Sequence, residues 1–185
     1  MKLRKIIKLL FLFVSIILLC SVFFFLNPPV PNDFKSKIHD NEKVILIDFR
    51  RPSFLKRLWL LENNKILLSC HVSHGINSGN IYANNFSNIV GSNKSSLGEF
   101  KTAEIYYRGN SKRMRIDGLI KGVNDNARKR YIVFHEAYYA EYDFLIRNLK
   151  LGRSKGCFVT SEYYNNLIID LTKNGTKIFV LGQDK

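Results

Sequence analysis

A short segment near the C-terminus places a thiol among groups that suit nucleophilic chemistry. Residues 152–157 read Gly-Arg-Ser-Lys-Gly-Cys, so Cys157 follows a glycine and lies near the cations Arg153 and Lys155. Nearby positive charge stabilises a thiolate, which is the reactive form of cysteine, and a glycine lets a substrate approach the backbone. A buried structural cysteine is the commoner interpretation of an isolated Gly-Cys pair. Cys157 is therefore a candidate nucleophile that needs a partner.

His135 is the partner that the sequence offers. It ends an apolar run over residues 131–135 that predicts a β-strand. A side chain at a strand end can face a cleft while the strand fixes its backbone, which suits a catalytic base. A following helix and loop can return Cys157 to this strand end. We expect His135 to be the base, with a packed or surface histidine as the alternative.

The elements that must position these two side chains are mostly strands. Branched and aromatic residues predict strands over residues 44–49, 57–61, 65–72, 100–107, 113–116, 131–135 and 177–181. Asn63-Asn64 predicts a hairpin turn, and the Ser-, Asn- and Gly-rich residues 73–98 predict a long functional loop. The expected fold opens as a β-meander and is mostly β.

Two helical patterns accompany these strands. They cover residues 138–148 and 162–172, the second with Thr160 or Ser161 as its N-cap and Asn174-Gly175 as its end. Both patterns lie between predicted strands. We therefore expect peripheral helices around the mostly β domain.

The N-terminal residues predict a membrane segment. Leu9 to Leu26 are apolar except for Ser15, Cys20 and Ser21, and they follow a basic cluster. At about 1.5 Å per residue this run covers about 27 Å, close to the thickness of a bilayer's hydrocarbon core. The sequence therefore predicts an uncleaved transmembrane signal-anchor over residues 1–26. Signal cleavage with secretion, or lipidation at Cys20, are the alternatives.

The expected organisation has one folded domain behind this anchor. Residues 27–41 are a proline-containing linker, and residues 42–185 form the domain. Because the basic flank stays on the cytoplasmic side, the domain should lie in the periplasm or an equivalent extracytoplasmic space, anchored to the inner (cytoplasmic) membrane. The exported part then faces the cell wall.

The net charge indicates the kind of binding partner, and the cysteine content bears on disulfide bonds. The net charge of +14 favours an anionic partner, such as a cell-wall polymer or lipid headgroup, and the leader argues against nucleic acid. A solvated basic surface without function is the alternative. The 3 cysteines imply no disulfide framework, although a bridge between Cys70 and Cys157 remains open.

With these motifs in place, the sequence resembles the murein L,D-transpeptidase catalytic domains of the YkuD-like fold, in particular the subgroup with a Gly-Arg-Ser-x-Gly-Cys motif. The resemblance spans most of the exported region. Its matching pieces are Ile47-Asp48, His74-Gly75, Phe86-Ser87-Asn88, Ser95 to Gly98, Gly118-Leu119 with Asn124 and Ala127, Arg130 to His135, and Gly152 to Cys157. The implied fold is a β-sandwich or barrel with peripheral α-helices.

The resemblance implies a role for each matching catalytic position. Cys157 corresponds to the nucleophile and His135 to the base that takes its proton. Gly156, with the backbone N–H of Cys157, corresponds to the region that receives the developing oxyanion. Ser154 corresponds to the hydroxyl residue that orients the histidine.

The substrate-binding candidates are Arg153, Lys155 and His74. Arg153 suits a clamp on a substrate carboxylate, with a salt-bridged structural arginine as an equal alternative. His74 matches a family position but could be a solvated turn residue. The chain departs from many relatives at Lys155, at Phe158 and at Glu136, whose carboxylate could raise the pKa of the neighbouring imidazole.

The implied reaction is acyl transfer on peptidoglycan stem tetrapeptides. A thiolate attacks the carbonyl before a D-amino acid, releases D-Ala and leaves a thioester, which a second stem resolves to form a 3-3 crosslink. Resolution by water would instead give an L,D-carboxypeptidase. A non-catalytic, membrane-tethered wall-binding module is the alternative from another class, and an unrelated cysteine hydrolase also remains. Neither a metal nor an organic cofactor is expected.

Overall fold

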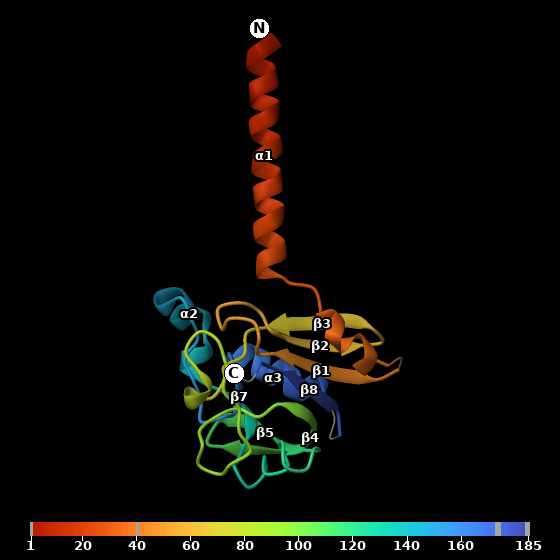
Figure 1. Ribbon diagram of the computed structural model, residues 1–185, viewed down its shortest axis with the longest axis vertical. Coiled ribbons are helices and arrows are strands. Elements are labelled where there is room, and N and C mark those ends of the chain that lie inside the picture. Colours follow the sequence, from red (N-terminus) through yellow and green to blue (C-terminus); the bar gives the residue numbers. More distant parts are fainter. Residues whose placement is uncertain (1, 40, 173–174, 184–185) are drawn as a thin grey trace. The chain divides into compact units, whose positions relative to one another are not determined.

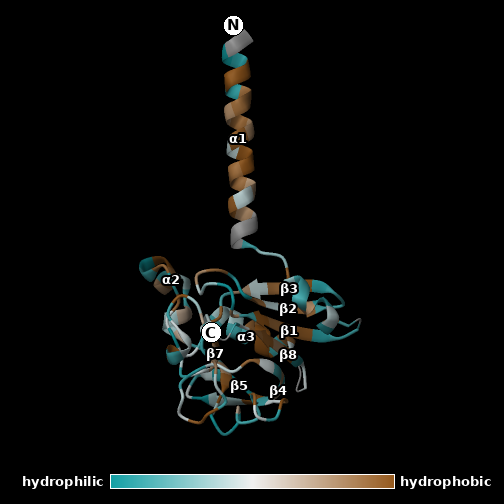
Figure 2. Cartoon of the chain, in the orientation of Figure 1, coloured by the Kyte–Doolittle hydropathy of each residue, from teal (hydrophilic) through white to brown (hydrophobic). Residues whose placement is uncertain are grey.

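The apolar leader forms one long helix. The computed structural model describes residues 2–39, 41–172 and 175–183, and α1 spans Lys2–Leu26. Figure 2 shows α1 as hydrophobic over most of its length. Within the described residues, Arg4–Phe23 is the stretch of helix that is long and apolar enough to cross a membrane. The chain divides into two units, residues 1–30 and residues 31–185.

The second unit contains an eight-stranded sheet (Figure 1). Its spatial order is β3-β2-β1-β8-β4-β5-β6-β7. The strands are β1 (Lys43–Asp48), β2 (Leu58–Glu62), β3 (Lys65–Cys70), β4 (Gly98–Arg108), β5 (Ser111–Gly118), β6 (Val133–Glu136), β7 (Phe158–Thr160) and β8 (Lys177–Leu181). Each predicted strand is present to within a few residues at its ends, and the mostly β fold with peripheral helices is confirmed.

The opening meander consists of three apolar strands, and the last two are joined by a tight turn that suits a hairpin. β1 pairs antiparallel with β2, and β2 pairs antiparallel with β3. Asn63 and Asn64 have φ values of 51° and 62°, the left-handed conformation that a tight hairpin requires and that asparagine tolerates. The parallel partner of β1 is β8, which brings the C-terminal strand into the middle of the sheet.

Alternation along β5 and β6 separates a core face from an outer face. Met114, Ile116 and Phe134 are buried, whereas Arg113 and His135, their neighbours in sequence, are partly exposed. Successive side chains of a strand point to opposite faces of the sheet, so this pattern directs His135 away from the core. The strands therefore carry the candidate base on the face opposite their apolar side chains.

Phe158 anchors β7 in this core. Its ring lies 5.4 Å from the ring of Phe134 and 5.6 Å from that of Phe100, measured between centroids. Ile168 and Ile169 of α3 (Glu162–Leu171) belong to the same cluster of buried side chains. Because Cys157 immediately precedes this buried phenylalanine, the packing fixes the backbone that carries the thiol.

The helices differ in detail from the predicted ones. The run over residues 138–148 is divided into η3 (Tyr138–Ala140) and α2 (Tyr142–Asn148), because Glu141 has an extended backbone with ψ of 156°. Ser161 is the N-cap of α3, as predicted, but its side chain makes no cap hydrogen bond. Glu141 Oε1 instead accepts the backbone N–H of Glu162 at 2.8 Å. The predicted helix end at Asn174-Gly175 lies partly outside the described residues, and α3 ends at Leu171.

The segment predicted as a linker carries structure of its own. A short 3-10 helix, η1, spans Asn32–Lys37, and Phe34 within it is fully buried. The second unit accordingly begins at Pro31, and the domain boundary at residue 42 stays a prediction. Another short 3-10 helix, η2 (Ile76–Ser78), lies in the predicted loop over residues 73–98.

Candidate active site

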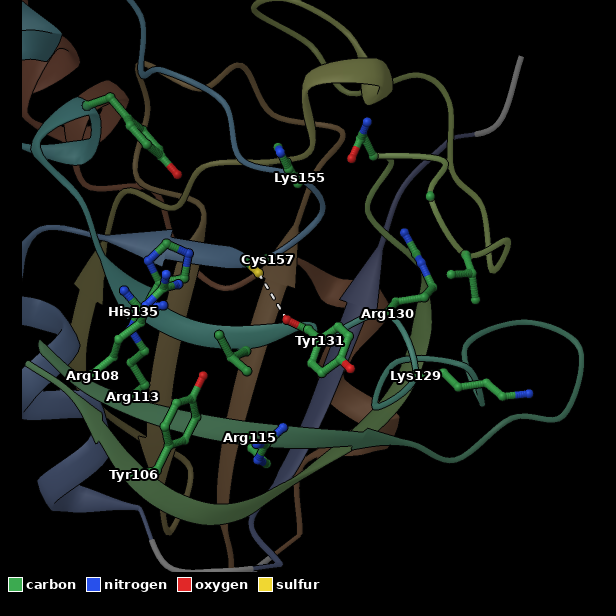
Figure 3. A pocket seen from close by; sticks show the side chains of 15 residues that line it. Tyr106, Arg108, Arg113, Arg115, Lys129, Arg130, Tyr131, His135, Lys155 and Cys157 are labelled. Atoms are coloured by element: carbon green, nitrogen blue, oxygen red, sulfur yellow. Dashed lines mark hydrogen bonds between the residues drawn. The ribbon is translucent and has the colours of Figure 1, made fainter.

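Cys157 and His135 line one cavity of about 760 Å³ (Figure 3). Its floor is the outer face of β4, β5 and β6, and residues of the loop over 73–98 form part of its wall. The lining residues are Val90, Gly91, Asn93, Tyr106, Arg108, Arg113, Arg115, Lys129, Arg130, Tyr131, Val133, His135, Tyr139, Lys155 and Cys157. The predicted nucleophile and base thus share a solvent-reachable groove.

The loop before β7 is held by the hydroxyl of Ser154. Ser154 Oγ donates to the carbonyl oxygen of Cys157 at 2.8 Å and accepts the backbone N–H of Gly156 at 3.0 Å. The backbone of Ser154 is in turn fixed on both sides, by the carbonyl of His74 and the N–H of Ile76. Ser154 therefore shapes the turn that carries the thiol. The expected contact between Ser154 and the histidine does not appear among the contacts of the described residues.

Gly156 is required at its position for two reasons. Its φ of 114° lies in a region that residues with a side chain rarely adopt. A Cβ atom there would also lie 2.7 Å from the carbonyl oxygen of Lys94 and 2.9 Å from Cδ1 of Ile132. Because the N–H of Gly156 already donates to Ser154 Oγ, the N–H of Cys157 is left as the candidate donor for the expected oxyanion region.

The thiol of Cys157 is held in its protonated form. Burial raises its pKa, and the backbone N–H of Val133 and the charges of Arg113 and Arg130 oppose this only in part. The Sγ–H donates to the carbonyl oxygen of Tyr131 at 3.5 Å, as an uncharged thiol can. The sequence suggested that Arg153 and Lys155 would favour the thiolate. The cations that act on the sulfur in the structure are Arg113 and Arg130.

His135 is poised as a neutral base. Burial lowers its pKa, Arg113 adds to this effect, and the Glu136 carboxylate and carbonyl oppose it without reversing it. Nδ1 lies 2.9 Å from the carbonyl oxygen of Glu136, and a carbonyl oxygen can only accept, so Nδ1 carries the proton. Nε2 is then the nitrogen with a free lone pair. The contact that orients the ring is thus with the adjacent backbone, and Glu136 does not produce the net rise in pKa that we considered.

The three predicted substrate-binding residues fall in different places. Lys155 lines the cavity, and its side chain is exposed. Arg153 is exposed outside the lining and donates to the carbonyl oxygen of Gly79 at 3.1 Å, so it has a structural contact rather than a place in the groove. His74 is fully buried, with Nδ1 accepting from Arg57 Nη2 at 2.8 Å. Its prediction as a substrate ligand is wrong for this conformation, because the ring lies in the core.

Arg130 is a site residue that the motif analysis did not single out. It lines the cavity, donates to the carbonyl oxygen of Ser87 at 2.6 Å, and also bonds the carbonyl oxygen of Lys94. These contacts tie the loop over residues 87–94 to the wall of the groove. The sequence did contain a signal for Arg130, because this residue begins the run Arg130 to His135 that matches the family.

Tyr131 and Tyr139 complete the surroundings of the sulfur. Tyr131 has a φ of 56°, an unusual value for an aromatic residue, and this conformation accompanies the approach of its carbonyl to Cys157. Tyr139 lies beneath Gly152, where an added Cβ would be 2.4 Å from the tyrosine Cβ. Tyr131 lies within the matching run Arg130 to His135, whereas no sequence pattern marks Tyr139, which acts through a tertiary contact.

The described residues contain two further features relevant to the predictions. Cys70 and Cys157 are both free thiols, so the alternative of a bridge between them is excluded in this structure. No group of three or more His, Cys, Asp or Glu side chains among the described residues could hold a metal ion. The expectation of chemistry without a cofactor stays a prediction.

Comparison with known proteins gives a family match over nearly the whole second unit. The family model described as L,D-transpeptidase catalytic domain matches residues 30–181. The comparison with curated proteins gives no match.

Solved structures of similar fold agree with this match. The Ldtfm-avibactam carbamoyl enzyme aligns with a TM-score of 0.50 at 16% identity, over 79% of this chain and 50% of that one. The helical cell shape determining protein Pgp2 (K307A mutant) from Campylobacter jejuni aligns with a TM-score of 0.51 at 12% identity, over 79% of this chain and 49% of that one. This chain therefore spans about half the length of those relatives. At such identities the likeness shows the fold alone.

Proposed function

Because this chain belongs to the L,D-transpeptidase catalytic domain family, we propose that it is a peptidoglycan L,D-transpeptidase with Cys157 as nucleophile and His135 as base. The observation that carries this proposal is the shared groove, in which a thiol and a neutral imidazole lie on the lining. The substrates proposed are stem tetrapeptides, and the product is a 3-3 crosslink.

The first half of the reaction forms a thioester. His135 Nε2 accepts the thiol proton as the sulfur attacks the carbonyl between the L-centre of the third residue and D-Ala. The N–H of Cys157 stabilises the negative oxygen of the tetrahedral intermediate. The imidazolium then gives its proton to the departing amine, D-Ala leaves, and the acyl group remains on the sulfur.

The second half regenerates the enzyme. His135 takes a proton from the side-chain amine of an acceptor stem, the amine nitrogen attacks the thioester, and the new amide bond forms as the C–S bond breaks. The sulfur recovers its proton from the imidazolium. Water in place of the amine would give an L,D-carboxypeptidase through the same thioester, so product analysis distinguishes the two activities.

We propose that the enzyme works outside the cytoplasm, attached by α1. The helix over Arg4–Phe23 is the feature that supports membrane attachment, and a cleaved signal peptide would pass the same test of length and composition. N-terminal sequencing of the mature protein distinguishes the two, because cleavage would remove the first residues.

The test is covalent labelling followed by product analysis. Intact mass after incubation with a carbapenem should increase by the mass of one inhibitor for the wild type and stay unchanged for Cys157→Ala. Incubation with muropeptide tetrapeptides should give crosslinked dimers, whereas tripeptide without dimer would indicate hydrolysis. A folded wild-type protein that gains no mass and releases no D-Ala would support the wall-binding module instead.

A further inference from the structure

The groove around Cys157 is lined by cations. They come from three parts of the chain: β4 and β5, the segment before β6, and the loop before β7. The lining cations are Arg108, Arg113, Arg115, Lys129, Arg130 and Lys155. Within the part of the chain that the structure describes, no aspartate or glutamate lines the same cavity. A groove with one sign of charge concentrates ligands of the opposite sign.

Several cations on other surfaces are paired with carboxylates. Arg50 Nε lies 2.8 Å from Asp48 Oδ1, Arg128 Nε lies 2.6 Å from Asp117 Oδ1, and Lys177 Nζ lies 3.0 Å from a carboxylate oxygen of Glu42. In the groove, Arg115 is paired in this way, with Nε 3.2 Å from Glu104 Oε1. No ion pair is found for Arg108 or Arg113 among the described residues.

The sheet register places these two arginines beside the reacting groups. Tyr106 pairs with Arg113 across β4 and β5, and Arg115 pairs with Val133 across β5 and β6, so Arg113 lies opposite His135. Arg108, two residues beyond Tyr106, lies on the same face. Figure 3 shows Arg108 and Arg113 near His135, on the side of the thiol away from Arg130.

Local contacts leave the Arg113 guanidinium able to bind a ligand. Its Nε donates to Ser111 Oγ at 3.0 Å, which orients the group, and the described contacts include no partner for its terminal nitrogens. Arg108 is exposed. Arg115 differs, because its guanidinium also lies over the Tyr106 ring at 4.8 Å. A planar guanidinium with two free N–H groups suits a carboxylate through parallel hydrogen bonds.

The chemistry of the donor stem supplies such a carboxylate. In a diaminopimelate stem, the attacked carbonyl belongs to the L-centre, and the side chain ends in a D-centre with one ammonium and one carboxylate group. Amidation of that carboxylate, or replacement of diaminopimelate by lysine, leaves the ammonium without a compensating negative charge. A cationic sheet face attracts the first kind of side chain and repels the other two.

We propose that Arg108 and Arg113 bind the free D-centre carboxylate of the donor diaminopimelate, and so make the enzyme selective against amidated and lysine-containing stems. This inference rests on the proposed function and specifies its substrate class. The cations on the other side of the thiol remain available for the carboxylate of the departing D-Ala.

The test measures kcat/KM for D-Ala release by the full-length chain in detergent. Three donor tetrapeptides are compared, which differ only in carrying diaminopimelate, amidated diaminopimelate or lysine at the third position. The wild type should prefer the free diaminopimelate peptide by about tenfold or more, a ratio typical of one charge-assisted contact. Arg108→Gln should reduce this preference by lowering kcat/KM for that peptide alone. Arg113→Gln should lower kcat/KM for that peptide by a larger factor than for the other two, because the charge of Arg113 also acts on Cys157 and His135.

Arg115→Gln is the matched control on the same strand and face. Because Arg115 is paired with Glu104 and its guanidinium lies over the Tyr106 ring, this variant should keep the preference of the wild type. Calorimetry of the same three peptides with Cys157→Ala measures their binding affinities, and therefore the preference among them, without turnover. It should show the same order of affinity.

The outcomes separate the inference from the proposed function. Equal kcat/KM values for the free and amidated peptides would overturn the inference, as would a preference that survives both Arg108→Gln and Arg113→Gln. No release of D-Ala from any peptide, with no carbapenem adduct, would overturn the proposed function. In that event, equal binding of the three peptides to Cys157→Ala would overturn the inference as well.

Discussion

The reactivity of Cys157 depends on a balance between burial and local charge. The apolar surroundings raise the pKa of the thiol, while Arg113, Arg130 and the N–H of Val133 lower it by less. His135 is kept neutral by its own burial. At neutral pH the two resting groups are therefore a thiol and a neutral imidazole, and in the proposed mechanism the proton moves when the substrate is attacked. An ion pair in the resting state is not expected.

This balance predicts the pH dependence of alkylation. In a protein with Cys157 as its single thiol (Cys20→Ala, Cys70→Ala), the rate of reaction with iodoacetamide should increase with pH and continue to rise beyond the ordinary thiol pKa of about 8.5. The sign follows from the raised pKa, because the thiolate forms only as the pH passes it. Formation of the carbamidomethyl adduct can be followed by intact mass. A rate that is already constant between pH 6 and 7 would indicate a thiolate-imidazolium pair instead.

Gly156 offers a test of the backbone that presents the thiol. Gly156→Ala should abolish or strongly slow acylation by a carbapenem, because the new Cβ meets Lys94 O and Ile132 at a φ of 114°. Backbone strain alone should lower the free energy of unfolding by about 1–3 kcal/mol. Acylation kinetics and urea denaturation measure the two effects.

The matched control for this substitution is Gly109→Ala. Gly109 also has a positive φ, of 59°, but no atom lies within 4 Å of the added Cβ. We expect a loss of about 1 kcal/mol in stability with acylation retained. Equal acylation rates for the two variants would show that the close approach at Gly156 does not position the sulfur.

Among the elements of the fold, a buried arginine connects the meander to the turn that carries Cys157. Arg57 is fully buried and donates to the carbonyl oxygen of Val72 at 2.7 and 2.9 Å and to His74 Nδ1, with its guanidinium 5.0 Å from the centre of the Phe49 ring. The carbonyl of His74 accepts the N–H of Ser154 at 2.9 Å. The contacts therefore run from the residue that precedes β2 to the turn before Cys157.

This arrangement predicts a loss of stability in mild acid. Burial lowers the pKa of His74 to about 3 and that of His71 to about 4, whereas the pKa of a histidine in the unfolded chain is about 6.5. The unfolded chain therefore binds more protons below pH 6.5. The free energy of unfolding should fall by up to about 1.4 kcal/mol per pH unit for each histidine between pH 6.5 and 4.

Urea denaturation at pH 7, 6 and 5 measures this slope. His74→Asn removes one titrating ring and keeps an acceptor for Arg57. Its slope should be smaller than that of the wild type by up to about 1.4 kcal/mol per pH unit, and His71 and His135, whose pKa values burial also lowers, should account for the remainder. An identical slope in the two proteins would contradict the assignment of His74 as a buried neutral group.

The elements also show where sequence patterns sufficed. Branched and aromatic residues over 113–116 and 131–135 predicted both strands, because such side chains favour strands. The pattern over residues 138–148 has helical spacing throughout, but the chain is extended at Glu141, whose carboxylate accepts the N–H of Glu162. That interruption depends on a neighbour far along the chain, so no local pattern reveals it.

At the scale of the whole molecule, the start of the second unit is the feature most open to test. Phe34 is fully buried in the unit that begins at Pro31, although the predicted domain starts at residue 42. A chain of residues 31–185 should therefore be more stable than one of residues 42–185. The expected difference is about 3–5 kcal/mol, the cost of removing a buried phenylalanine.

Thermal and urea unfolding of the two truncated chains measure this difference. Phe34→Ala in the longer chain should reproduce most of the loss, because it removes the same buried ring. Equal stability of the two chains would place the boundary at residue 42, as the sequence analysis expected.

The sequence predicted the mostly β fold and the family, both of which are confirmed, and it predicted an apolar N-terminal helix and a nucleophile and base at Cys157 and His135, which line one cavity. These follow from local patterns, since hydrophobic period, turn residues and a short motif are properties of neighbouring positions. Only the tertiary structure decided that His74 is buried, that Arg153 lies outside the groove, and that Arg108, Arg113 and Arg130 line it. Burial and charge at a site depend on which distant strands become neighbours, and that information is absent from any single segment.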